Sequence, residues 1–345
     1  MKKGIAFLLT LFLCFGMLAG CASEPTSSTA GSGSSEPASS DSGQTSESLA
    51  TSDDPVKIFM IGSMPGGAAW GQCEKGFMTA CEELGWEGQY LAPSQPSNTT
   101  EMVNLVETAL TNGADIVMPN CNNVEAFADV ISHAKELGIP MVGISNRHED
   151  LVAYIGMDPT NLGQAIAEAL VQAAGDDPIH VVTVQTSLAQ SGQNQQREAF
   201  EEKLLELRPD AVVVGREECT SNAATAQDKI SALKLANPDL NCAVSFDSYA
   251  GLGAATFVEA NGLQGEFHVV GIDDSPEILM CVENGLMDCT VAQMWYNVGY
   301  DGVYLAKQVY DGETVEFAND AGSKILFPED LNGWIEERGI DMSAS

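Results

Sequence analysis

Side chains that can hydrogen-bond to a small polar molecule occur in six short segments, each of which follows a run of β-branched and other apolar residues. The segments cover residues 63–70, 145–147, 186–194, 247–249, 273–274 and 293–295. They contain amides, carboxylates, one guanidinium group and aromatic rings. Amides and guanidinium groups donate hydrogen bonds, carboxylates accept them, and an aromatic face packs against C–H groups. This combination predicts recognition of a small polar molecule by binding.

Arrangements typical of catalysis, or of a tightly bound metal or cofactor, are missing from the sequence. The six segments hold no nucleophile–base pair, and no G-x-S-x-G motif occurs. The glycine-rich stretch 62–67 lacks both the lysine of a phosphate-binding loop and the spacing of a dinucleotide motif. The histidines at 133, 148, 180 and 268 are scattered, without metal-ligand spacing. We therefore expect no catalytic residue, no metal and no cofactor, and a protein that is not an enzyme.

The runs between the six segments predict the elements that position them. We expect strands at 56–62, 115–118, 140–144, 152–156, 179–185, 211–215, 242–246, 267–272 and 287–293, and helices at about 70–84, 99–112, 123–137, 159–174, 192–207, 222–236, 249–260, 276–284 and 295–311. Asp158-Pro159 and Ser275-Pro276 are typical of helix starts. Such alternation predicts parallel sheets with helices on both faces, in which ligands bind beyond the carboxyl ends of the strands.

The first 20 residues predict an export signal. Lys2 and Lys3 precede an apolar run at 4–18, which is shorter than the about 20 residues that a membrane-spanning helix needs. Small residues surround Cys21, a pattern that resembles the bacterial lipobox and implies cleavage after Gly20 and acylation of Cys21. An ordinary signal peptide with an incidental cysteine is the alternative.

Residues 21–54 predict a tether between the lipid and a folded domain. Beyond Cys21 this stretch consists mostly of Ser, Thr, Gly, Pro, Ala and acidic residues, which cannot bury enough apolar surface to fold. We therefore expect a protein that faces outside the cell membrane on a lipid anchor, and the length of the tether is typical of Gram-positive lipoproteins.

The chain is strongly acidic. It carries 49 acidic and 15 Lys or Arg residues, for a formal charge of -34, and loss of Lys2 and Lys3 with the signal lowers this charge to -36. Such a charge argues against nucleic acid and anionic lipid surfaces as partners. The seven cysteines beyond Cys21 contain no C-x-x-C spacing, so we expect small buried side chains and leave their pairing open.

Five stretches resemble, in the same order, motifs of the type I periplasmic-binding-protein superfamily, in its ribose- and galactose-binding branch of sugar ABC transporters. They are Ala69-Trp70, residues 139–147 (IPMVGISNR), 246–254 (FDSYAGLGA), 269–273 (VVGID) and 289–293 (CTVAQ). The resemblance covers about residues 56–327, nearly all of the predicted folded part. It implies an α/β fold of two Rossmann-like lobes with parallel sheets, joined by three hinge crossings, with a ligand enclosed between the lobes.

The same resemblance, together with the positions of polar residues after strands, predicts the binding residues. We expect ligand contacts from Trp70, Asn146, Arg147, Asn194, Asp247, Asp273 and Gln293, and name Ala69, Gln193, Tyr249 and Trp295 as weaker candidates. Asn146 and Asn194 stand where the family has an aspartate and an arginine, and Ala69 stands where it has a phenylalanine. The aromatic residue expected near Ser221 is also absent. Because the pocket departs from the family in this way, we do not infer ribose as the ligand.

Each candidate also has a structural interpretation. Asp273 could cap the helix that follows it, although Ser275 already fits that position. Arg147 could form a surface ion pair and Gln293 could satisfy a strand end. Trp70 and Trp295 could belong to the core.

The resemblance implies an organisation and a function. Residues 55–157 plus 294–322 would form the N-terminal lobe, and 158–293 plus 323–345 the C-terminal lobe. We expect a monomeric solute-binding protein that captures a monosaccharide or polyol and delivers it to the permease and ATPase subunits of an ABC importer. One alternative is a receptor component that presents an autoinducer or a sugar to a sensor kinase. Another is a secreted lipoprotein hydrolase, for which the sequence shows no nucleophile or metal site.

Overall fold

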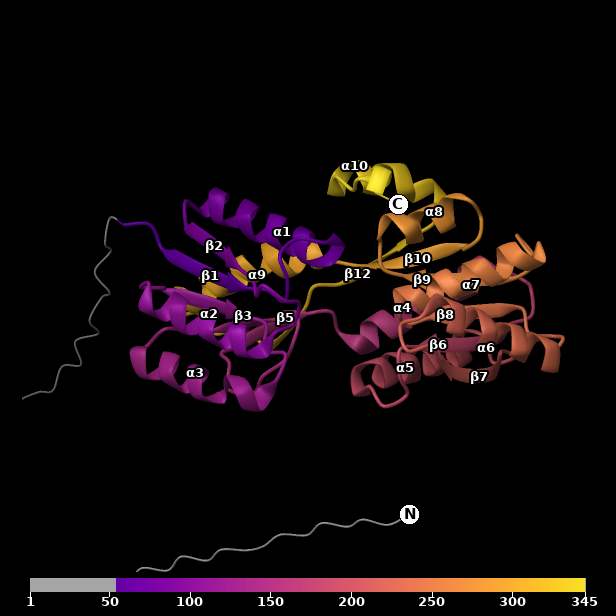
Figure 1. The fold of residues 1–345 in the computed structure, drawn as a ribbon, viewed down its shortest axis with the longest axis horizontal. Coiled ribbons are helices and arrows are strands. Elements are labelled where there is room, and N and C mark those ends of the chain that lie inside the picture. The colour runs from indigo at the N-terminus through magenta and orange to yellow at the C-terminus, as the bar shows by residue number, and fades with distance from the viewer. Residues whose placement is uncertain (1–53, 345) are drawn as a thin grey trace, which may run out of the picture. The chain divides into compact units, whose positions relative to one another are not determined.

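Strands and helices alternate along the chain as the apolar patterns predict (Figure 1). The computed structural model of the protein describes residues 54–344. The predicted signal at 1–20, the predicted lipid site Cys21 and nearly all of the predicted tether lie outside the described residues. No helix in the described part is long and apolar enough to cross a membrane.

The first lobe is built on two three-stranded sheets that a single parallel bridge between Val117 and Met141 connects. The strand orders are β2-β1-β3 and β11-β5-β4, and every pairing is parallel. The strands are β1 (Lys57–Ile61), β2 (Glu87–Leu91), β3 (Ile116–Pro119), β4 (Val142–Ile144), β5 (Ala153–Gly156) and β11 (Ala318–Asp320). Their helices are α1 (Ala68–Leu84), α2 (Thr99–Thr111), α3 (Val124–Leu137) and α9 (Trp295–Tyr310).

The second lobe is built on one six-stranded sheet of order β12-β10-β9-β8-β6-β7, in which only the β10–β12 pair is antiparallel. The strands are β6 (His180–Gln185), β7 (Val212–Glu218), β8 (Cys242–Ser245), β9 (His268–Ile272), β10 (Cys289–Gln293) and β12 (Ser323–Leu326). The helices are α4 (Pro159–Ala174), α5 (Ser191–Leu207), α6 (Ala223–Ala236), α7 (Ser248–Asn261), α8 (Pro276–Glu283) and α10 (Leu331–Arg338), with short 3₁₀ turns η1 (Pro328–Asp330) and η2 (Met342–Ala344).

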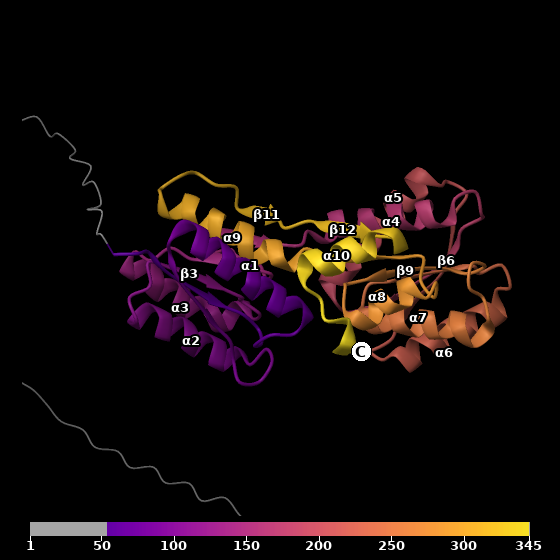
Figure 2. The same ribbon diagram turned by 90° about the horizontal axis from the view of Figure 1, so that it is seen from above.

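Burial explains why the central strands form where they do. Every residue of β3, β8 and β9 is buried, as expected for parallel strands that helices cover on both faces. Close helix contacts complete the two cores. A Cβ atom at Gly299 would lie 2.0 Å from the Cys73 carbonyl oxygen, so only glycine allows α9 to approach α1 in this way (Figures 1 and 2).

The chain passes between the lobes three times, after β5, after β10 and after β11. Asp320 fastens two of these crossings together. Its carboxylate accepts hydrogen bonds from the Asp158 backbone N–H (2.9 Å), the Asn161 side chain (2.7 Å) and the Gly322 N–H (3.0 Å). The predicted fold class, an α/β protein of two lobes with parallel sheets and three crossings, is confirmed.

Helix α10 packs on the second lobe and also contacts the first. Trp334 is buried in the core of the second lobe, and its Nε1 donates to Asp274 Oδ2 over 2.9 Å. The Arg338 carbonyl accepts from the side chains of Gln72 (3.0 Å) and Lys75 (3.1 Å) of α1. Figure 2 shows α10 beside the ends of α1 and α9. The C-terminal helix therefore links the two lobes.

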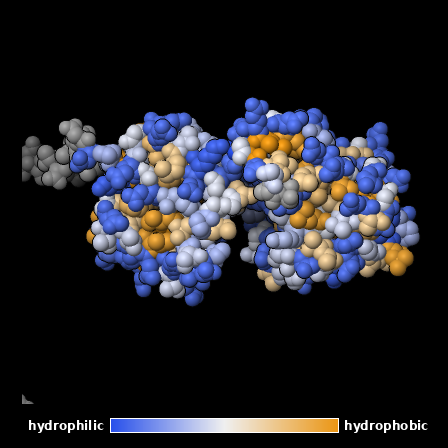
Figure 3. Space-filling model, turned by 45° about the horizontal axis from the view of Figure 1, so that its top comes forward, coloured by the Kyte–Doolittle hydropathy of each residue, from blue (hydrophilic) through white to orange (hydrophobic). Residues whose placement is uncertain are grey.

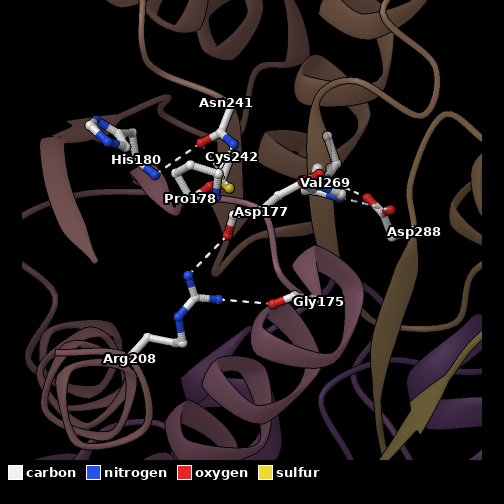
Figure 4. Close-up of polar contacts among 10 residues, drawn as sticks. Gly175, Asp177, Pro178, His180, Arg208, Asn241, Cys242, Val269 and Asp288 are labelled. Atoms are coloured by element: carbon white, nitrogen blue, oxygen red, sulfur yellow. Dashed lines mark hydrogen bonds and ion pairs between the residues drawn. The ribbon is translucent and has the colours of Figure 1, made fainter. Parts of the chain in front are cut away.

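Polar side chains close the amino edge of the second sheet (Figure 4). Asn241 Oδ1 accepts from the His180 N–H (2.9 Å), and its Nδ2 donates to the Pro178 carbonyl (2.6 Å). Asp288 accepts from the Val269 N–H (2.7 Å), and Arg208 donates to backbone carbonyls of the 175–177 turn. Nearly all of these bonds reach backbone groups, so this edge has a structural role.

The nine predicted strands and nine predicted helices are all present, with ends that differ by a few residues. The sequence did not predict β2, β11, β12 or α10. The reason is visible in β2, whose residues Glu87–Leu91 are polar and half-exposed at the edge of a sheet. Such a strand has no continuous apolar run.

Replacement of Asn241 by alanine is expected to lower the free energy of unfolding by about 1–3 kcal/mol, because it leaves the His180 N–H and the Pro178 carbonyl without their partner. Urea unfolding measures this change. Asn104→Ala, at an exposed position of α2, is the control and should change little. Equal stability of the two variants would contradict the role of Asn241.

Asp274→Asn is expected to remove a pH dependence of stability. Burial raises the pKa of the Asp274 carboxyl from 3.8 to about 6. Between about pH 4 and pH 6 the folded protein therefore keeps a proton on Asp274 that the unfolded chain has released. The protonated carboxyl thus stabilises the folded state below about pH 4, and this contribution to the free energy of unfolding is lost as the pH rises through about 6. Relative to the parent, the free energy of unfolding of Asp274→Asn should rise by up to about 3 kcal/mol between pH 4 and pH 7. If the free energies of unfolding of variant and parent change in the same way between pH 4 and pH 7, Asp274 has no such effect.

Candidate ligand-binding site

The carboxyl ends of the strands in both lobes lie next to the crossings. The chain leaves the carboxyl end of β5 to begin α4 in the second lobe, and it leaves the carboxyl end of β10 to begin α9 in the first. Because strands in a parallel sheet end at the same edge, the loops after the other parallel strands lie at this edge too. The predicted site residues belong to these loops or to the helix turns that follow them, except Gln293, which is the last residue of β10.

Asp273 lies directly after β9 and is held by two side chains of the second lobe. Ser248 donates to its Oδ2 and Gln293 donates to its Oδ1, while Thr290 donates to its backbone carbonyl over 2.7 Å. Burial raises the pKa of its carboxyl, against the two side-chain hydrogen bonds, which lower it. A carboxylate has about four acceptor positions. Asp273 thus keeps capacity to accept hydrogen bonds from a ligand.

The backbone of Asp273 has φ 72°, in the left-handed region. Residues other than glycine adopt this region at a cost, with Asn and Asp among the best tolerated. The turn directs the Asp273 side chain to Ser248 and Gln293 and away from the start of α8. Ser275 occupies the N-cap position of α8 as expected, but its hydroxyl makes no capping hydrogen bond. The expectation that the Ser275 side chain caps α8 is therefore wrong.

Asp247 has its acceptor positions filled by the protein itself. Its Oδ1 accepts from the Ala250 N–H (3.1 Å), and so caps α7, and from the Cys219 thiol (3.8 Å). Its Oδ2 accepts from Thr186 (2.6 Å) and Ser221 (2.9 Å). These bonds join the loops that follow β6, β7 and β8. The predicted ligand contact from Asp247 stays a prediction, and the structure gives this carboxylate a structural role.

Asn194 and Gln193 lie in the first turn of α5 and hold the loop that precedes it. Asn194 accepts from Gln185 (3.0 Å) and donates to the Leu188 carbonyl (2.9 Å). Gln193 accepts from the Thr186 N–H (3.0 Å) and donates to the Phe246 carbonyl (2.8 Å). Both amides are thus engaged inside the second lobe.

Trp70 and Trp295 lie together in the first lobe, with ring centroids 5.3 Å apart at an angle of 49°. Trp70 is only 8% exposed and belongs to the core, with Ala69 partly buried beside it. Trp295 is half-buried and lines a cavity, so it is the ring that a ligand can reach.

Asn146 belongs to a polar chain at the carboxyl ends of β1, β3 and β4. It donates to Asn120 Oδ1, and Asn120 donates to Ser63 Oγ. Asn120 is 1% exposed. Sequence reasoning missed Asn120, which directly follows β3 but lies two residues beyond the predicted end of that strand at 118.

Arg147 and Tyr249 lie farther out. The Arg147 side chain is 56% exposed, its Nε donates to Glu149 over 3.0 Å, and its guanidinium lies 4.9 Å from the centre of the Phe317 ring. The ion-pair interpretation of Arg147 therefore describes what the structure shows. Tyr249 is 52% exposed. Neither side chain is among those that hydrogen-bond to Asp273.

Two cavities lie along the crossings. The first, which we call the inter-lobe cavity, has a volume of about 550 Å³ and is lined by Ser145, Met157 and Trp295 of the first lobe and its crossings, and by Gln193, Gln196 and Gln293 among the residues of the second. The other, of about 740 Å³, includes Asn146 and Arg147. Both volumes are typical of small-molecule sites, which span about 300–1,000 Å³.

The metal-ligating and thiol side chains of the described residues are scattered or buried. Among residues 54–344 no group of three or more His, Cys, Asp or Glu side chains could hold a metal ion. The seven cysteines of this part are free, and all but Cys281 are buried. Burial raises the pKa of Cys73 and Cys121 to about 12, so these thiols stay protonated and unreactive at neutral pH.

The comparisons with known proteins agree with this geometry. Residues 58–314 match the family described as "Periplasmic binding protein domain". The ribose import binding protein of Salmonella typhimurium is 23% identical over 238 residues, which cover 68% of this chain and 79% of that protein. The D-ribose/D-allose-binding protein of Pseudomonas aeruginosa is 25% identical over 238 residues, with 65% and 72% coverage.

Solved structures show the same fold. The arabinose-binding protein of Geobacillus stearothermophilus superposes with a TM-score of 0.74 at 20% identity, over 81% of this chain and 99% of that one. The glucose-galactose binding protein of the same organism gives 0.67 at 23% identity, with the same coverage. Since the family match spans most of the described residues, this chain belongs to the periplasmic binding protein domain family, in its type I, ribose-binding-like branch.

Proposed function

We propose that this protein is an extracytoplasmic solute-binding protein that captures a small polyhydroxylated ligand, a monosaccharide or polyol, between its two lobes and delivers it to an ABC importer. The observation that carries the proposal is the Asp273 carboxylate, half-buried beside a crossing, held by Ser248 and Gln293, and still able to accept hydrogen bonds. Relatives whose names describe binding or import of ribose and allose support the ligand class.

The proposed site combines residues of both lobes. Asp273 would accept hydrogen bonds from ligand hydroxyls, and Gln293 would donate to them. Asn146 would contact the ligand from the first lobe, and the Trp295 ring would pack on its C–H face. Trp70 would support Trp295, and Asp247 and Asn194 would act mainly by fixing the loops around the ligand. Arg147 would join the site only after its pair with Glu149 opens.

Closure of the lobes would supply specificity. We propose that the N-terminal lobe comprises residues 55–157 plus 294–322 and the C-terminal lobe 158–293 plus 323–345, and that they move about the three crossings. A closed site excludes water, so a ligand hydroxyl or a protein group left without a partner costs free energy. Stereoisomers that leave such groups unmatched would therefore bind more weakly.

Transport, rather than chemistry on this chain, completes the proposal. A monomer would dock on a membrane permease, whose ATPase subunit would hydrolyse ATP. The lipid on Cys21 and the 21–54 tether would hold the binding domain near that permease and raise its effective concentration there. The face shown in Figure 3 is mainly hydrophilic, with apolar patches on both lobes.

Ligand binding is expected to raise the melting temperature of the mature protein. A panel of D-ribose, L-arabinose, D-allose, D-glucose, D-galactose and polyols tests this by thermal shift. A ligand at 100 times its dissociation constant stabilises by about 2.7 kcal/mol. If every sugar and polyol leaves the melting temperature unchanged, the proposed function is wrong.

Asp273→Asn is expected to abolish most of that shift, because the amide presents a donor where the ligand needs an acceptor. Asparagine suits the left-handed backbone, so the melting temperature without ligand should stay close to that of the parent. Asp228→Asn, an exposed position of α6, is the control and should keep the full shift. An undiminished shift in Asp273→Asn would remove this residue from the site.

Cys21→Ser in the full chain is expected to move the protein from the membrane fraction to the soluble fraction, because the acylated thiol is lost. Cys14→Ser, in the apolar run of the signal, is the matched control and should leave the protein in the membrane fraction. Fractionation of cells that express each variant measures the difference. Membrane retention of Cys21→Ser would contradict the lipid anchor.

A further inference from the structure

The inter-lobe cavity carries no charged side chain among the residues that line it. Its polar groups are the hydroxyls of Ser145 and Ser191 and the amides of four glutamines, Gln190, Gln193, Gln196 and Gln293. This neutrality is specific to the place. The chain has 49 acidic residues, and the adjoining cavity of about 740 Å³, which shares lining residues such as Ser145 and Met157 with this one, carries Arg147, Asp158 and Asp320.

An amide-lined cavity favours a neutral ligand with many oxygens. Each glutamine side chain can both donate and accept, as each hydroxyl of a polyol can. A carboxylate or phosphate moved into the same space would lose its hydration without gaining an opposite charge, which is costly. The exposed Arg147 does not line this cavity, and its guanidinium already pairs with Glu149.

Gln196 differs from the other glutamines of the cavity. It is 6% exposed, yet its Nε2 has no hydrogen-bond partner among the residues that the structure describes. By contrast, the NH₂ group of Gln193 donates to the Phe246 carbonyl and that of Gln293 donates to Asp273. Gln190 is exposed. Gln196 therefore offers a buried donor that the protein itself leaves unused.

The position of Gln196 is fixed by the packing of α4 against α5. A Cβ atom at Gly163 of α4 would lie 2.1 Å from the Gln196 carbonyl oxygen, so the two backbones are in direct contact there. Leu162, the neighbour of Gly163, also lines the cavity. The backbone of Gln196 is thus held in place by the contact of the two helices, and a buried donor without a partner costs free energy.

We propose that Gln196 is a specificity-determining residue that donates a hydrogen bond to an oxygen of an uncharged, polyhydroxylated ligand in the inter-lobe cavity, and that this cavity rejects sugar acids. The inference rests on the proposed function. It adds a residue that contacts the ligand and a charge limit on the ligand class. Binding would give the buried Gln196 donor a partner, so the ligand relieves a cost that is present in the unliganded protein.

Gln196→Leu tests the residue. The neutral sugar that gives the largest shift with the parent, chosen from the panel above, serves as the probe, and calorimetric titration of the mature protein measures its dissociation constant. We expect an increase of tenfold or more, with the melting temperature of the unliganded variant equal to or above that of the parent. Gln308→Leu, at an exposed position of α9 outside both cavities, is the control and should leave the constant unchanged.

A series of deoxy analogues of the same sugar separates a contact from a structural effect. One analogue should bind the parent as weakly as the complete sugar binds Gln196→Leu, and should lose no further affinity in the variant. Gln196→Leu with the affinity of the parent, or equal losses for every analogue, would overturn the role of Gln196. If no neutral sugar binds the parent, the proposed function fails instead.

D-Glucuronate and D-galacturonate test the charge limit beside D-glucose and D-galactose. At a concentration 100 times the dissociation constant of the neutral sugar that binds, the matching acid should give no thermal shift with the parent. A shift from the acid equal to that from the neutral sugar would overturn the charge limit.

Discussion

Parallel pairing of strands places their carboxyl ends at one edge of a sheet, and the candidate site depends on this constraint. In each lobe the chain leaves the sheet for the other lobe at that edge, after β5 and after β10. The loops that carry Asp273, Gln293 and Asn146 are thereby next to the crossings, where Asp320 fastens the backbone of one crossing to another. The amino edge of the second sheet has the opposite character, because its polar side chains bond mainly to backbone groups.

Asp247 and Asp273 each follow a strand of the second sheet, but they differ in how many further hydrogen bonds they can accept. The reason is that the protein supplies them with different numbers of donors. Asp247 receives hydrogen bonds from one backbone N–H, two hydroxyls and a thiol, which leaves it few free acceptor positions. Asp273 receives two side-chain donors and adopts a left-handed backbone that turns it away from the following helix. Position after a strand therefore predicts where a polar side chain lies, while the local donors determine whether it can bind a ligand.

The apolar pattern predicted the fold closely because buried parallel strands such as Val269–Ile272 are continuous apolar runs. It missed β2 and β11, which lie at sheet edges with polar residues, and α10, whose apolar contacts are few and distant in sequence. For the site, the sequence located Asp273, Gln293 and Trp295 at the crossings. It could not show that Asn194 is engaged with Gln185 and Leu188, or that Arg147 pairs with Glu149, because those contacts depend on side-chain packing. Asn120 could have been predicted from its position just after a strand.

A binding site between lobes has to reconcile stability with recognition. Every polar group that the folded protein satisfies internally, as at Asp247 and Gln193, stabilises the lobe but is lost to the ligand. A group that stays unsatisfied, as the Gln196 amide does, costs stability and is free to recognise. The tight contact between α4 and α5 holds the backbone of Gln196 in place, and the packing of these helices offsets the free energy that the unsatisfied amide costs. Recognition of a neutral ligand can then combine the Asp273 carboxylate with unsatisfied dipoles such as the Gln196 amide.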